Sequence, residues 1–236
     1  MVAKKRLLIY IIVEVALLLT LVGFQIATVI QGYKVYDKSA PLFYPYIALF
    51  QVGLTFISLA FALIEFIISK RKKAYFVWPL YFLIISIADI FFSLTPYVLG
   101  GHIGFACAYL LFLFYRKPKR FEYIIYGVLI AAGISILAIV KKLSPMIGVD
   151  IALGVILVSN LVATWIKYGK SKDKNIRLFA IALTIIVISD LTIALRTAIS
   201  NPLALNYAIS LITWPTYIAG NILLVIAFLR KQESLL

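Results

Sequence analysis

The sequence predicts an all-helical integral membrane protein with eight transmembrane helices and both termini in the cytoplasm. Of its 236 residues, 64% are hydrophobic and only 14% are charged, a balance that soluble domains do not have. The apolar runs are long enough to cross a bilayer as helices and lack the turn residues that interrupt a β-barrel sequence. Basic residues gather in every second connection between the runs.

Eight apolar segments have about the length of one bilayer crossing. The N-terminal run follows Met-Val-Ala-Lys-Lys-Arg as the core of a signal peptide would, but it is too long and lacks a small-residue cleavage site, so we interpret it as the first span. Pro96 and Gly100-Gly101 mark a short turn before the fourth span, and residues 167–177 are expected to form the largest loop. The expected spans are residues 7–30, 42–69, 74–97, 101–115, 121–140, 144–166, 178–200 and 203–229.

The positive charge is best explained by membrane topology. The formal net charge is +14, yet 18 of the 23 Lys and Arg residues fall on one side of the eight predicted spans. This bias follows the positive-inside rule and predicts that both termini are cytoplasmic. Solvated cytoplasmic loops account for the charge, so we expect no nucleic-acid partner.

Two segments about a hundred residues apart resemble each other. Residues 84–94 read Ile-Ile-Ser-Ile-Ala-Asp-Ile-Phe-Phe-Ser-Leu, and residues 185–195 read Ile-Ile-Val-Ile-Ser-Asp-Leu-Thr-Ile-Ala-Leu. Each carries one carboxylate at the same place in an apolar helix. Because four spans separate equivalent positions, the two halves would have the same orientation, which is the parallel type of repeat. We therefore predict a single transmembrane domain with related halves at 1–120 and 121–236.

Asp89 and Asp190 are the leading candidates for catalysis. At about 1.5 Å per residue they lie about 24 Å and about 20 Å from the basic residues at the inner ends of their spans, past the middle of the bilayer. A carboxylate at that depth is costly and normally faces the bundle interior with a partner or a role. Burial and a second carboxyl nearby both disfavour the ionised form, which suits general acid catalysis. Alternatively, each Asp fixes helix packing through a hydrogen bond.

The remaining candidates are polar groups that could bind a substrate. Tyr217 and Asn221, four residues apart on one helix face, could contact a substrate, an Asp or a neighbouring helix. Arg196 could hold a phosphate, or it could extend to anionic headgroups at the membrane surface. Glu14 and His102 are both expected at the interface, and Glu14 should be partly hydrated there. With one His, one Cys and no nucleotide-binding loop in the sequence, we expect no metal and no organic cofactor.

The chain resembles the YhhN-like family of membrane lysoplasmalogenases at three short motifs. Ala88-Asp89-Ile90 is similar to the Gly-Asp of the third span, Ser189 to Leu195 to the Ser-Asp segment of the seventh, and Tyr217-Ile218-Ala219 to the closing Tyr-x-Ala. The resemblance covers mainly residues 80–230. The sequence differs from the family at Tyr109, a position at which relatives have a histidine.

The resemblance implies hydrolysis of the vinyl-ether bond of lysoplasmalogen or a related ether lysolipid, with Asp89 and Asp190 as catalytic residues. Tyr109, Tyr217, Asn221 and Arg196 are then expected to bind the lysophospholipid. The alternative is a non-catalytic lipid-binding protein or a proton-coupled small-molecule transporter that uses the same buried acids. A third possibility is a scaffold that has lost activity with the histidine. The headgroup and oligomeric state stay open, and the Ile, Lys, Phe and Tyr enrichment indicates a prokaryotic cell membrane.

Overall fold

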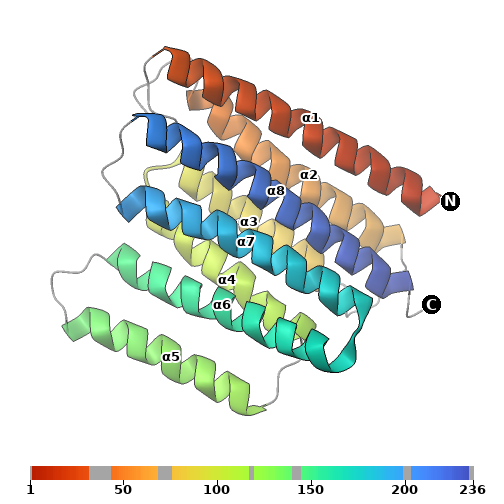
Figure 1. Ribbon diagram of the computed structural model, residues 1–236, viewed down its shortest axis with the longest axis vertical. Coiled ribbons are helices and arrows are strands. Elements are labelled where there is room, and N and C mark those ends of the chain that lie inside the picture. Colours follow the sequence, from red (N-terminus) through yellow and green to blue (C-terminus); the bar gives the residue numbers. More distant parts are fainter. Residues whose placement is uncertain are drawn as a thin grey trace. The chain divides into compact units, whose positions relative to one another are not determined.

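Eight α-helices make up the computed structural model, which describes residues 2–31, 44–68, 76–116, 120–139, 145–198 and 203–233 (Figure 1). These ranges contain no strand. The helices are α1 (Val2–Ile30), α2 (Tyr44–Ile68), α3 (Val77–Leu94), α4 (Val98–Arg116), α5 (Arg120–Ile139), α6 (Pro145–Ser171), α7 (Lys174–Ala198) and α8 (Leu203–Glu233).

Each helix coincides with one predicted apolar span, which confirms the all-helical fold. In the described ranges, six helices are long and apolar enough to cross a bilayer, namely α1, α2, α3, α6, α7 and α8. The apolar part of α4, Val98–Leu113, is shorter, and α5 is not among the six. The membrane class is therefore supported, while the number of eight spans, the internal repeat, the single domain and the orientation stay predictions.

The chain divides into two compact units. The first comprises Met1–Phe61 and Ile181–Leu236, and the second comprises Ala62–Ala180. The first unit thus holds α1, most of α2, most of α7 and α8, and the second holds α3 to α6 with the adjoining ends of α2 and α7.

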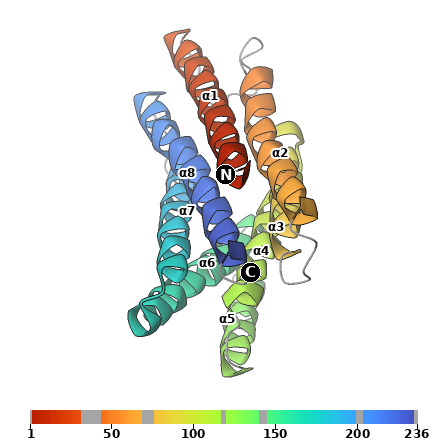
Figure 2. The same ribbon diagram turned by 90° about the vertical axis from the view of Figure 1, so that its right-hand side faces the viewer.

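In the first unit, α1 packs against both α2 and α8. Aromatic rings join α1 to α2, since Tyr10 stacks on Phe61 with ring centroids 4.5 Å apart and Phe24 stacks on Tyr46 at 5.2 Å. Contacts between α1 and α8 extend this packing. Figure 2 shows α7 beside α8, where the backbone of Gly220 lies close to the side chain of Ile186.

In the second unit, α3 packs closely on α4, α4 packs on α6, and α5 lies against α6 (Figure 1). An aromatic cluster fills the space between α3, α4 and the start of α7. Its rings meet edge to face or tilted, with centroids 5.0 Å apart for Tyr81 and Phe112 and 5.4 Å apart for Phe112 and Phe179. Such pairs stabilise a core beyond the burial of their area.

A buried polar cluster joins α1 to α2 and corrects one expectation from the sequence. Glu14 is only 1% exposed, so the prediction of a partly hydrated interfacial side chain is wrong. Ser58 on α2 donates a hydrogen bond to Glu14 Oε1 at 2.8 Å, and the Tyr10 hydroxyl donates to Ser58 Oγ at 2.9 Å. Glu14 lies one turn after Tyr10, on the face of α1 that packs against α2, and this packing removes it from water.

Replacing Ser58 by Ala should destabilise the first unit. The change leaves the Tyr10 hydroxyl and Glu14 Oε1 buried without their shared partner, which costs about 1–3 kcal/mol and lowers the apparent Tm by several degrees. Thermal unfolding in detergent would measure the change. Thr20→Ala is the matched control, because among the described residues the exposed Thr20 hydroxyl bonds to the Ala16 carbonyl of its own helix and to no other helix. Equal Tm values for the two variants would contradict the prediction.

Candidate functional site

Asp89 lies on a buried polar face of α3. It is 3% exposed, and Ser86 and Ser93, one turn before and one turn after it, are buried as well. Spacings of three and four residues place the three side chains on one side of the helix. Among the described residues, the buried Ser86 hydroxyl has no hydrogen-bond partner. A polar face of this kind in an apolar helix can accept a polar ligand or water.

Small residues in α4 hold this part of α3 in place. The backbones of Gly101 and Gly104 approach Ala88, the residue before Asp89. A Cβ atom on Gly104 would lie 2.7 Å from Ala88 Cβ, and one on Gly101 would lie 3.0 Å from the Ala88 carbonyl oxygen. The 2.7 Å contact leaves no room for a side chain at Gly104, and a side chain at Gly101 would press on the Ala88 carbonyl oxygen. The position of Asp89 therefore depends on the absence of side chains at two positions of α4.

Tyr109 lies deep in the aromatic core of the second unit. Its side chain is 0% exposed, and its ring stacks on Phe112 with centroids 5.7 Å apart. The Asn160 amide on α6 donates a hydrogen bond to the Tyr109 carbonyl oxygen at 3.3 Å and so links α6 to α4. Asn160 is fully buried, and no motif in the sequence singled it out as a site residue.

His102 lies near the start of α4, and its expected depth at the membrane interface stays a prediction. Within the second unit it is 7% exposed, and its ring lies against Phe92 of α3. His102 Nδ1 meets the carboxylate of Asp150 on α6 at ion-pairing distance. The pair links α4 to α6 at the ends of these helices. Sequence reasoning missed it because residues 48 positions apart meet only through the helix packing.

Asp190 lies half-buried on α7 in the first unit. The preceding residue, Ser189, is fully buried and donates a hydrogen bond to the Thr213 carbonyl oxygen of α8 at 3.0 Å. The Thr192 and Thr213 hydroxyls meet at 2.7 Å. Ser189, just before Asp190, and Thr192, two residues after it, therefore both link α7 to α8 through hydrogen bonds.

Tyr217 and Asn221 lie on α8, 4% and 2% exposed respectively. The Tyr217 ring packs edge to face on Trp214, with centroids 5.4 Å apart. Their spacing of four residues places them on one face of the helix, as predicted. Arg196 belongs to α7 by its backbone, but its side chain lies outside the described part of the chain.

The predicted site residues fall in different units. Asp89 and Tyr109 belong to the second unit, whereas Asp190, Tyr217 and Asn221 belong to the first. The meeting of the two acids at one site therefore stays a prediction. Within the described ranges, no three His, Cys, Asp or Glu side chains gather closely enough to hold a metal ion.

Comparison with known proteins gives one match. A family model described as the YhhN family matches residues 46–228, a range that includes both aspartates and all the other predicted site residues. Glu14 lies before the matched range. Searches of curated proteins and of solved structures returned no match. A match over this much of a chain with six membrane-length helices shows that the chain is a membrane protein that belongs to the YhhN family.

Proposed function

We propose that this YhhN family member is a membrane-embedded hydrolase that cleaves the vinyl-ether bond of lysoplasmalogen or a related ether lysolipid. Asp89 and Asp190 are the catalytic pair in this proposal. Tyr109, Tyr217 and Asn221 would line the path of the lipid, and Arg196 would hold its phosphate through a charge-assisted hydrogen bond. The proposed location is a prokaryotic cell membrane.

The reaction needs a proton and a water molecule. A neutral carboxylic acid donates its proton to the vinyl carbon distant from oxygen, which leaves an oxocarbenium ion. Water adds to that ion and gives up a proton to a carboxylate, which restores the acid. The resulting hemiacetal breaks its bond to the glycerol oxygen, with transfer of its hydroxyl proton to that oxygen, to give a fatty aldehyde and a glycerophospho-alcohol. One Asp would act as the acid while the other, ionised, orients the water and stabilises the positive charge.

The polar face around Asp89 is the observation that carries the proposal. An ionisable side chain 3% exposed in an apolar helix is costly, and such residues in membrane helices usually serve a function. Ser86, one turn away, adds a buried hydroxyl without a partner among the described residues. A catalytic water or a substrate oxygen would satisfy that hydroxyl. A purely structural Asp would not require an unsatisfied hydroxyl group on the same helix face.

The decisive experiment measures aldehyde release from lysoplasmalogen by the purified full chain in detergent. A hydrolase consumes the lipid without a sealed membrane. A proton-coupled transporter, the alternative function, requires closed vesicles and a gradient. Flux in proteoliposomes together with no aldehyde in detergent would overturn the hydrolase proposal in favour of transport.

Tyr109→His tests the possibility of an inactive scaffold. If the family histidine is required, the native chain should release no aldehyde, and this one substitution should introduce activity. If the Asp pair suffices, the native chain is active and the variant gains little. Because Tyr109 is fully buried beside Phe112, the variant's Tm should be measured as well, so that loss of folding is distinguished from loss of chemistry.

A further inference from the structure

Four exposed cations lie around the turn between α6 and α7 in the second unit, and a fifth, Lys167, lies one helical turn earlier on α6. Lys170, Lys172, Lys174 and Arg177, here called the basic corner, are all exposed. Only two residues separate α6 from α7. The one acid between residues 165 and 180 is Asp173. The corner therefore carries a net positive charge on a short stretch of chain.

The basic corner has a defined backbone. Lys172 adopts the left-handed conformation with φ 55°, and its N–H donates to the Tyr168 carbonyl oxygen at 2.8 Å, which ends α6. Asp173 Oδ1 then accepts hydrogen bonds from the N–H groups of Asn175 at 2.7 Å and Ile176 at 3.4 Å, which starts α7. The carboxylate of Asp173 is thus used as a helix cap, and the turn fixes the spacing of the cations.

The outer surface of α6 places the basic corner at headgroup depth. Val158, Val162 and Ile166 are exposed at intervals of four residues, so they form an apolar stripe of the kind that faces lipid. Trp165 is 39% exposed and packs edge to face on Tyr168, and aromatic residues of this type concentrate at the membrane interface. Lys170 follows Ile166 by one turn, about 6 Å along the helix. The cations therefore begin where the apolar stripe ends.

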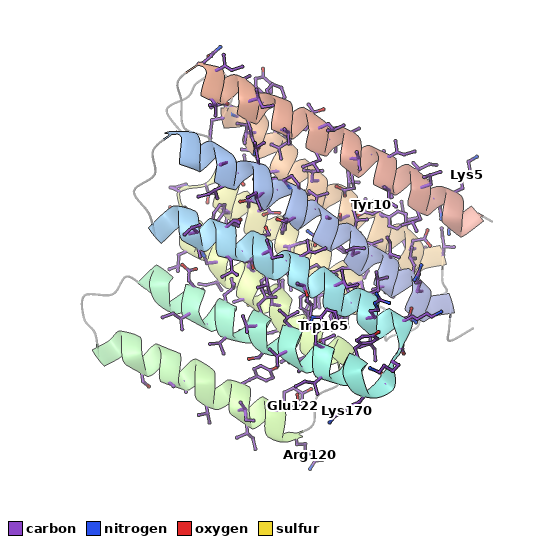
Figure 3. The ribbon with its side chains drawn as sticks, viewed as in Figure 1. Lys5, Tyr10, Arg120, Glu122, Trp165 and Lys170 are labelled. Atoms are coloured by element: carbon purple, nitrogen blue, oxygen red, sulfur yellow. The ribbon has the colours of Figure 1, made fainter. Side chains whose placement is uncertain are left out.

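Two further features near the basic corner agree with a position at headgroup depth. Arg120, the first residue of α5, is exposed and lies at the same end of the α5–α6 pair as Lys170 (Figure 3). The Lys172 ammonium lies over the Tyr168 ring, 5.6 Å from its centroid. In the described part of the chain, Lys170, Lys174 and Arg177 take part in no ion pair.

We propose that the basic corner binds the phosphate groups of anionic phospholipids in the surrounding bilayer. Exposed cations next to a lipid-facing helix attract anionic headgroups, and the attraction adds with each Lys or Arg. The long side chains can reach the phosphate while their methylene groups stay on the apolar surface. Trp165 and Tyr168 indicate the depth at which the headgroup phosphates lie. The basic corner is separate from the proposed catalytic residues, so this proposal does not depend on the hydrolase assignment.

The test compares two variants that each remove two positive charges. The first is Lys170→Gln with Lys174→Gln, and the control is Lys5→Gln with Arg230→Gln, two exposed cations of the other unit. Native mass spectrometry of the full chain in detergent would measure binding of phosphatidylglycerol and phosphatidylcholine. We expect the native chain to prefer phosphatidylglycerol. The basic-corner variant should bind phosphatidylglycerol about tenfold more weakly or worse, while the control keeps its affinity.

A second measurement distinguishes lipid from other anions. Phosphatidylglycerol should raise the Tm of the native chain above its value in phosphatidylcholine, and high salt should remove the difference. Equal lipid affinity in both double variants would overturn the assignment to this corner. The same shift produced by inorganic phosphate alone, or by a single-stranded oligonucleotide, would overturn the lipid assignment. Unchanged Tm values of both variants without added lipid would show that folding is intact.

Discussion

Asp89→Asn and Asp190→Asn are each expected to lower the rate of aldehyde release by about 10²–10⁴-fold. Asparagine has nearly the shape of aspartate but can neither donate an acidic proton nor carry the negative charge that stabilises an oxocarbenium ion. The rate is measured with the purified chain in detergent at saturating lysoplasmalogen. A shift in KM alone, with kcat unchanged, would instead assign the residue to substrate binding.

Asp173→Asn is the matched control for both aspartate variants. It makes the same chemical change at an exposed residue whose role is to cap α7, and asparagine caps helices as well as aspartate does. Its activity and Tm should equal those of the native chain. Full activity in both Asp89→Asn and Asp190→Asn would refute the proposed mechanism. If the variants lose both activity and folding, the two acids stabilise the packing of the helices and are not shown to be catalytic.

Gly104→Ala is expected to destabilise the second unit. The added methyl group would lie 2.7 Å from Ala88 Cβ, so α3 and α4 would have to separate where Gly104 meets Ala88. Overpacking of this kind costs about 1–3 kcal/mol, and thermal unfolding in detergent should show a Tm lower by several degrees. Because Ala88 precedes Asp89, the variant should also release aldehyde more slowly if the native chain is a hydrolase.

Gly154→Ala provides the control for this substitution. It adds the same methyl group to α6 in the same unit, where no heavy atom outside its own turn lies within 4 Å of the new Cβ. Alanine is favoured over glycine inside a helix by about 0.5–1 kcal/mol, so the Tm should stay the same or rise. A lower Tm for Gly154→Ala than for Gly104→Ala would show that the close contact between α3 and α4 is not what makes Gly104→Ala less stable.

Hydropathy predicted the helices well because it reports which residues must avoid water. It predicted their ends less well, because helices can continue beyond the apolar region. Residues 167–177 were expected to form the largest loop, but α6 continues to Ser171 and α7 begins at Lys174. The turn is set by the left-handed Lys172 and by the Asp173 cap, which are local backbone features. A hydropathy pattern does not report them.

The burial of polar side chains depended on packing that the sequence could not show. Asp89 was expected inside the protein because of its depth in the bilayer, and it is buried. Glu14 and His102 were placed at the interface for their positions near helix ends, and both are buried. Their partners, Ser58 and Asp150, lie on other helices and are far away in the chain. The position of a residue along its own helix can be predicted from the sequence. The residue that it meets on a neighbouring helix cannot be predicted in this way.

The proline inside α8 has a consequence for motion. Pro215 has no N–H to donate to the preceding turn, so the helix bends more easily there. Ser189 holds the Thr213 carbonyl oxygen of α8, two residues before that point. The first part of α8 is therefore tied to the residue next to Asp190, while Tyr217 lies beyond Pro215. If α8 bends at Pro215, Tyr217 changes its distance from Asp190, so under the proposed function the spacing between an expected lipid-binding residue and one of the two acids depends on this proline.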